Sequence, residues 1–170
     1  MSKAKLKKEL ELMSREQLID IILNVYSARK EAKDYFEFFL NPDSDALLEK
    51  YRELVKKEVI RAKRGNRSKF RISVIKRLIK DFQSLDPGPE YVLRLLSYSF
   101  SIVMLYSLVL YYSDIQDKGA LYLAKEVLDY GDSHQLYDTA IRHVNNVLQN
   151  ERGSAAYLRN MIARELGHSD

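Results

Sequence analysis

The strongest feature of the hydrophobic pattern is one long uncharged stretch, residues 89–113, set among amphipathic segments. The nineteen residues between Arg94 and Asp114 carry no charge. A helix that is apolar on all sides lies either in a membrane or at the centre of a folded domain. We interpret this stretch as a central buried helix around which the rest of the chain packs.

A membrane span is the alternative interpretation, because nineteen uncharged residues are long enough to cross a bilayer. The stretch also contains serines and tyrosines, which scatter round the helix, and only Ser97 and Ser101 share a face. No wholly apolar surface is then left for lipid, whereas a buried serine can bond to the carbonyl four residues earlier. With 31% charged residues in the chain, we expect a core helix and no membrane span.

Elsewhere, apolar residues recur every three or four positions, which is the period of helices with one buried face. The segment 3–12 is basic and too short to be stable alone. Ser14 and Gln17 have the spacing of a capping box, so a helix is expected to begin there. The break at 86–89, Asp-Pro-Gly-Pro, places Pro89 in the first turn of the central helix. The expected helical segments are 3–12, 15–40, a helix that follows a cap at 44 or 45 and has its apolar positions within 47–59, then 72–85, 89–113, 118–130, 134–149 and 154–166.

The segment 15–40 is predicted as one long amphipathic helix in which Arg29 is the one interruption of the stripe. A coiled-coil seam is the alternative, but additional apolar residues broaden the stripe and favour a helix of a globular domain. Pro42 ends this helix, and Ser44 or Asp45 is expected to cap the next one. The stripe is Leu18, Ile22, Val25, Ala32, Phe36 and Phe39.

No stretch alternates as a strand does, so the predicted fold class is all-α. We expect a single domain, 1–170, with about seven helices in antiparallel hairpins packed round the central apolar helix. No fixed repeat period holds, and an irregular bundle and a short αα-superhelix both stay open.

The sequence has no cysteine, which excludes disulfides, thiolate zinc sites and a cysteine nucleophile. The stretch 1–13 is charged and lacks the apolar region of a secretory signal. We therefore expect a cytoplasmic protein.

Candidate catalytic groups are sparse. The three histidines, His134, His143 and His168, do not share a helix face at metal-ligand spacing. Carboxylates after the central helix would do acid–base chemistry if they converged, but charges at a helix start and on a solvated face explain them better. These carboxylates are Asp114, Asp117 and Glu126. We expect no metal, no cofactor and no enzymatic activity.

The segment 56–80 is strongly basic. It holds eleven basic residues and one acidic residue, a net charge of +10, whereas the remaining residues carry 17 basic and 23 acidic side chains. Its centre is the connector 61–71. A basic edge on an acidic body attracts polyanions. The predicted polyanion-binding residues are Lys63, Arg64, Arg67, Lys69, Arg71, Lys76 and Arg77.

Several interpretations of this segment stay open. The charges could solvate a helix pair or bond to acidic residues of the body, and this is the simplest interpretation. Nucleic acid is the sharper functional hypothesis, with Phe70 as one aromatic side chain for base stacking. An acidic protein partner, self-association or a membrane surface are the alternatives.

The order of these features resembles an uncharacterised family of small all-helical bacterial proteins, a domain of unknown function. The matching stretches are residues 3–23 (KAKLKKELELMSREQLIDIIL), 38–51 (FFLNPDSDALLEKY), 63–65 (KRG), the break at 86–89 and the YSDI turn at 112–115. The resemblance covers about the first three-quarters of the chain. It implies a helical protein and nothing about chemistry.

Overall fold

The regular structure is helical throughout the residues that the computed structural model describes, which are 1–60, 70–110 and 112–167. The all-α prediction is confirmed, and nine helices in these residues exceed the expected seven or so. The helices are α1 (Lys3–Glu11), α2 (Arg15–Ala28), α3 (Lys30–Leu40), α4 (Ser44–Val59), α5 (Ile72–Gln83), α6 (Pro89–Tyr106), α7 (Asp114–Ser133), α8 (Tyr137–Gln149) and α9 (Ala156–Glu165).

The chain divides into two compact units, Met1–Pro42 with α1 to α3 and Asp43–Asp170 with α4 to α9. The expectation of a single domain stays a prediction. Among the described residues, α1, α2 and α3 contain no buried side chain. The first unit therefore has no core of the kind that stabilises a domain.

The predicted capping box at the start of α2 is confirmed. The Ser14 hydroxyl accepts from the Gln17 backbone N–H at 3.2 Å, and the Gln17 side chain accepts from the Ser14 N–H at 2.9 Å. The predicted continuous helix over 15–40 is wrong, because Arg29 is extended, with φ −132° and ψ 119°. The break lets the rings of Tyr26 and Phe36 approach to 6.5 Å between centroids. In a straight helix these residues would be about 15 Å apart along the axis.

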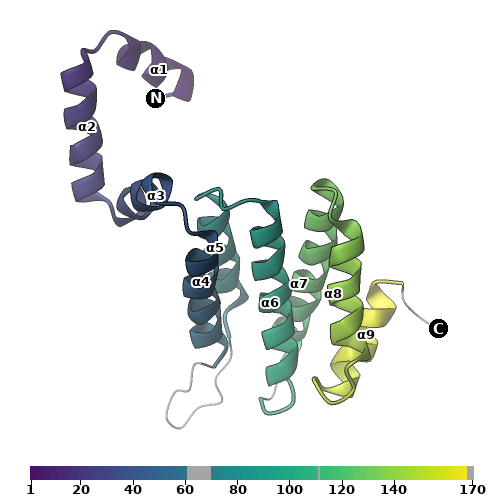
Figure 1. Ribbon diagram of the computed structural model, residues 1–170. Helices are drawn as coiled ribbons and strands as arrows, with labels where there is room; N and C mark the ends of the chain where they lie inside the picture. Colours follow the sequence, from purple (N-terminus) through teal and green to yellow (C-terminus); the bar gives the residue numbers. More distant parts are fainter. Residues whose placement is uncertain (61–69, 111, 168–170) are drawn as a thin grey trace. The chain divides into compact units, whose positions relative to one another are not determined.

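Three helical hairpins stand in a row in the second unit. Helices α4, α6 and α8 lie side by side, and α5, α7 and α9 form a second layer behind them (Figure 1). Successive helices run in opposite directions, as the short connections predict. Each hairpin covers the apolar face of the next one.

Helix α6 is the centre of this unit and contacts α4, α5, α7 and α8. Its buried side chains cover more than half of its circumference, and the remaining face, which includes Arg94 and Leu105, is exposed. Two of its serine hydroxyls are satisfied locally: Ser99 donates to the Leu95 carbonyl at 2.7 Å and Ser101 to the Ser97 carbonyl at 2.8 Å, whereas the buried Ser97 hydroxyl has no partner. The buried residues are Val92, Leu93, Leu95, Leu96, Ser97, Ser99, Phe100, Ile102, Val103 and Met104.

The central helix is shorter than predicted, since it ends at Tyr106 rather than Ser113. The Ser107 hydroxyl donates to the Met104 carbonyl and accepts the backbone N–H of Ala155 at 2.9 Å, which fixes the turn. Within the described residues no helix is both long and apolar enough to span a membrane.

Two helix starts differ from the sequence prediction. Asp43, not Ser44 or Asp45, caps α4 by accepting the Ala46 N–H at 2.9 Å. Ser44 instead donates to the Pro87 carbonyl at 3.0 Å and thereby ties α4 to the 86–89 break. Helix α7 begins at residue 114 rather than 118.

The early start of α7 results from a second capping box, which Ser113 and Gln116 form. Tyr112, just before it, is buried, and its hydroxyl donates to the Val103 carbonyl at 2.6 Å. Burial raises the pKa of Tyr112 well above its ordinary value, so the phenol stays protonated and keeps this bond.

Gly131 lies inside α7 and is buried, although the sequence predicts a boundary there. A Cβ at this position would lie 2.4 Å from the Cβ of Ala140 in α8. The absence of a side chain therefore sets how closely α7 and α8 pack.

Gly131→Ala is predicted to lower the free energy of unfolding by about 1–3 kcal/mol, because the overpacking outweighs the gain in helix propensity. Urea unfolding measures the change. Adding Ala140→Gly should restore most of the loss, and Gly119→Ala, with nearest contacts of 3.4 Å, should cost less. Equal stability of Gly131→Ala and the original protein would contradict the packing.

Candidate polyanion-binding surface

The predicted polyanion-binding residues fall into two groups. Lys63, Arg64, Arg67 and Lys69 lie outside the described residues. Arg71 immediately precedes α5 without a side-chain capping bond, and Lys76 and Arg77 lie within that helix. The structure therefore locates three of the seven predicted residues.

Arg71 is bound to Glu58 at the end of α4. Its guanidinium donates from Nε and Nη2 to the two carboxylate oxygens, both at 2.9 Å, and its backbone N–H donates to Oε1 at 3.0 Å. These hydrogen bonds raise the pKa of Arg71. Because Glu58 is 7% exposed, the carboxylate is desolvated and its charge needs this partner. Arg71 therefore has a structural role, since its bonds to Glu58 hold the end of α4 beside the start of α5; we call this pair the clamp.

Phe70 is buried at 2% exposure, so it is not the base-stacking side chain that the sequence suggested. Its ring packs edge-on against Tyr112, with the centroids 5.3 Å apart. The Gln116 amide donates to the Phe70 carbonyl at 3.3 Å. Phe70 is thus a core residue, although basic residues flank it in the sequence.

The outer face of α5 is cationic. Lys76, Arg77 and Lys80 are exposed on it, opposite the buried Ile75 and Ile79. Positions three and four apart share a helix face. Among the described residues no carboxylate forms an ion pair with Arg77 or Lys80. This pair of cations is therefore available to an external anion.

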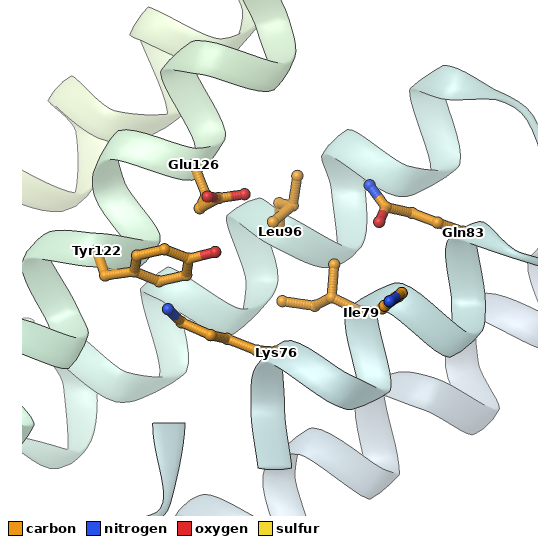
Figure 2. Close-up of a pocket in the computed structure, with 7 residues that line it drawn as sticks. Lys76, Ile79, Gln83, Leu96, Tyr122 and Glu126 are labelled. Atoms are coloured by element: carbon orange, nitrogen blue, oxygen red, sulfur yellow. The ribbon is translucent and has the colours of Figure 1, made fainter. Parts of the chain in front are cut away.

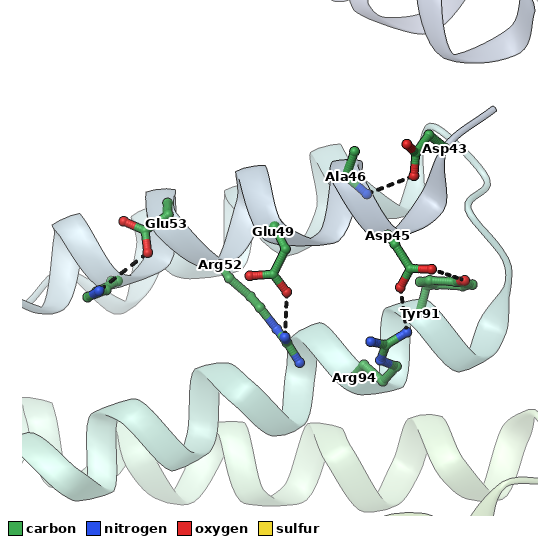
Figure 3. Close-up of polar contacts among 9 residues, drawn as sticks. Asp43, Asp45, Ala46, Glu49, Arg52, Glu53, Tyr91 and Arg94 are labelled. Atoms are coloured by element: carbon green, nitrogen blue, oxygen red, sulfur yellow. Dashed lines mark hydrogen bonds and ion pairs between the residues drawn. The ribbon is translucent and has the colours of Figure 1, made fainter. Parts of the chain in front are cut away.

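The neighbouring surface between α4 and α6 shows the contrast, because its charges are paired (Figure 3). Asp45 accepts from Arg94 and from the Tyr91 hydroxyl, both at 3.1 Å. Arg52 binds Glu49 at 2.6 Å and Lys56 lies 3.3 Å from Glu53. The contrast is therefore with the paired charges of this surface; exposed cations without an ion pair also occur elsewhere in the described part of the unit, for example Lys118 and Lys125 on α7.

A cavity of about 340 Å³ lies between α5, α6 and α7. Lys76, Ile79, Lys80 and Gln83 line one wall, Leu96 belongs to α6, and Tyr122 and Glu126 line the wall on α7 (Figure 2). The Lys76 ammonium lies 3.2 Å from the centroid of the Tyr122 ring, a cation–π contact. Lys76 is therefore both exposed and held by the cavity wall.

Tyr122 is a neutral phenol under ordinary conditions. Burial, followed by a hydrogen bond to Glu126 and the charge of that carboxylate, raises its pKa. A carboxylate has more acceptor capacity than one phenol uses. Glu126 therefore presents a further acceptor beside the cavity.

Sequence analysis did not identify this cavity. Tyr122 and Glu126 stand four residues apart, a spacing that many solvated helices share. Only the packing of α7 beside α5 brings them to Lys76, and no local signal encodes it.

The three carboxylates after the central helix do not converge. Asp117 accepts from the Tyr157 hydroxyl at 3.1 Å, and burial raises its pKa. Glu126 lies nine residues along the same helix, about 13.5 Å further and on the opposite face. Among the described residues no cluster of histidines and carboxylates could hold a metal ion.

A second cavity, of about 450 Å³, lies beside the 86–89 break, and Asp86, Tyr130 and His134 line part of it. The His134 ring stacks on Tyr130 with centroids 3.9 Å apart, and its Nδ1 lies 2.9 Å from the Tyr130 carbonyl. Burial, then the charge of Asp86, raises the pKa of Tyr130. These contacts give His134 a structural role at the C-terminal end of α7.

The fold and this surface define an all-helical protein with a row of antiparallel hairpins and one cationic helix face. The chain belongs to the Family of unknown function (DUF6155), whose model matches residues 1–147. The resemblance to an all-helical family of unknown function is confirmed, and its bacterial origin stays a prediction. No curated protein and no solved structure matches the chain.

Glu58→Gln is predicted to lower the free energy of unfolding by about 1–3 kcal/mol, because the buried acceptor loses its charge-assisted bonds to Arg71. Glu53→Gln is the matched control: it removes one carboxylate from an exposed pair and should cost at most about 0.5 kcal/mol. Urea unfolding of both variants measures the difference. Equal costs would show that Glu58 and Arg71 do not clamp the two helices.

Proposed function

We propose that this protein is a non-catalytic cytoplasmic binding protein whose basic edge contacts a polyanion, nucleic acid in particular. The observation that carries the proposal is the exposed face of α5, where Arg77 and Lys80 have no carboxylate partner among the described residues. Cationic side chains that form no ion pair within the protein raise the local concentration of phosphate groups. They bind a nucleic acid by releasing the counterions condensed on its backbone.

The sequence just before this helix is also basic. The segment 61–69, which follows α4 and precedes Phe70, contains Arg61, Lys63, Arg64, Arg67 and Lys69 and no acidic residue. The Glu58–Arg71 clamp holds the end of α4 beside the start of α5. The two described ends of the basic segment are therefore anchored next to the cationic helix. We propose a phosphate backbone as the ligand of the basic segment 56–80.

The alternative is a protein-interaction module that self-associates or binds an acidic partner. One observation favours it: apolar side chains on α2 and α3 are exposed, among them Leu23 at 56%, Phe39 at 65% and Leu40 at 70%. Exposed apolar patches of this kind mark interaction sites in many proteins.

The test is fluorescence anisotropy with labelled single- and double-stranded DNA and RNA at about 50 mM and about 200 mM salt. Arg77→Gln/Lys80→Gln should weaken binding to all sequences and reduce the slope of log K against log salt by about two, one for each lost phosphate contact. Lys118→Gln/Lys125→Gln is the matched control. It removes the same charge from α7 and should leave the slope nearly unchanged.

A variant with Lys63, Arg64, Arg67 and Lys69 changed to Ala tests the charge of the segment 61–69 in the same assay. It should weaken binding further. Absence of binding at the lower salt concentration would overturn the nucleic-acid proposal and leave the protein-interaction alternative.

A further inference from the structure

The cavity between α5, α6 and α7 differs from the flat cationic face beside it, because its two walls have opposite chemistry. The α5 wall has the ammonium groups of Lys76 and Lys80, and the α7 wall has the phenol of Tyr122 and the carboxylate of Glu126. Figure 2 shows Lys76, Tyr122 and Glu126 bordering one space, with the side chains of Ile79 and Leu96 facing it. Its volume of about 340 Å³ lies within the range of small-ligand pockets.

No ion pair joins the lysines of the α5 wall to the carboxylate of the α7 wall. Lys76 lies on the ring of Tyr122 rather than in an ion pair with Glu126. Lys80 forms no ion pair with a carboxylate of the described residues. The cavity therefore offers a cation at one wall and a carboxylate acceptor at the other, separated by the apolar side chains of Ile79 and Leu96.

A ligand that matches both walls has an anionic group at one end and hydrogen-bond donors at the other, with a flat apolar body between them. A nucleotide whose base has an exocyclic amino group meets these requirements. Its phosphate pairs with lysine, and its amino group donates to a carboxylate, as cytosine N4 does to Glu or Asp.

We propose that this cavity holds one unpaired, amino-bearing nucleotide of a single-stranded nucleic acid, with its phosphate at Lys80 and its amino group at Glu126. The proposal rests on the proposed function, of which it names the ligand class. The base must be unstacked to enter, so the protein discriminates single strands from duplexes and cytosine from thymine or uracil. Phosphate contacts on the outer face of α5 then provide affinity for any strand, and the cavity provides the preference for cytosine.

The experiment compares labelled oligo-dC and oligo-dT of equal length, which have the same backbone charge. The protein should bind oligo-dC about tenfold more tightly, which corresponds to one specific contact. Glu126→Ala should abolish the preference and leave oligo-dT binding equal or stronger, because an acidic group is lost. Asp129→Ala, with the same charge change one turn further along α7, should keep the preference. Glu126→Gln keeps the size of the side chain and removes its charge, so it controls for misfolding of Glu126→Ala. It should also reduce the preference for oligo-dC.

Titration with cytidine and uridine monophosphate, followed by NMR of the backbone amides, separates this proposal from the proposed function. Cytidine monophosphate should shift amides of α5 and α7 near the cavity, and uridine monophosphate should shift them less. Equal binding of oligo-dC and oligo-dT would overturn the cavity proposal and leave the proposed function standing. Amide shifts without binding of either oligonucleotide would overturn both proposals, because the cavity would then bind a free nucleotide and not a nucleic-acid strand. Absence of both would overturn both.

Discussion

Burial of α6 is the constraint on which the second unit depends. An uncharged helix exposes too much apolar surface to water unless other helices cover it on nearly every side. Helices α4, α5, α7 and α8 provide this cover, and helices that follow one another along the chain in this unit run in opposite directions (Figure 1). The same arrangement places α5 and α7 on either side of α6, where Leu96 forms part of the cavity between them. The candidate site is therefore a consequence of how the core is covered.

The distribution of charge in this unit follows from the same packing. Where α4 meets α6, acidic and basic side chains face each other and pair, as Asp45 does with Arg94. On α5 the outward positions include the cations Lys76, Arg77 and Lys80 together with Asp81. Of the predicted residues in the described part of the chain, Arg71 alone forms an ion pair, with Glu58. Lys76 is occupied differently, by the Tyr122 ring. The basic edge thus contains groups that hold the fold together and groups that face solvent, and our proposal rests on the second kind.

Local rules predicted local features well. Ser14 and Gln17 form the expected capping box, and Pro89 opens α6 as its restricted φ and missing N–H suggest. Features that depend on tertiary contacts were not accessible from the sequence. The sequence shows Arg29 as the one interruption of the stripe but does not predict that the backbone is extended there. Gly131 lies inside α7, where the close approach of Ala140 in α8 leaves no room for a side chain. Phe70 is buried although cations flank it. Tyr122 and Glu126 line the cavity only because α5 packs beside α7.

Native-state hydrogen exchange of the full chain, resolved by residue, tests the central claim that the fold is organised round α6. The account predicts the slowest exchange for amides of α6 between Val92 and Met104, with α1, α2 and α3 the fastest of the helices because no side chain in them is buried. Amides of α2 or α3 that exchange as slowly as those of α6 would contradict it, since they would require a core that includes the first unit.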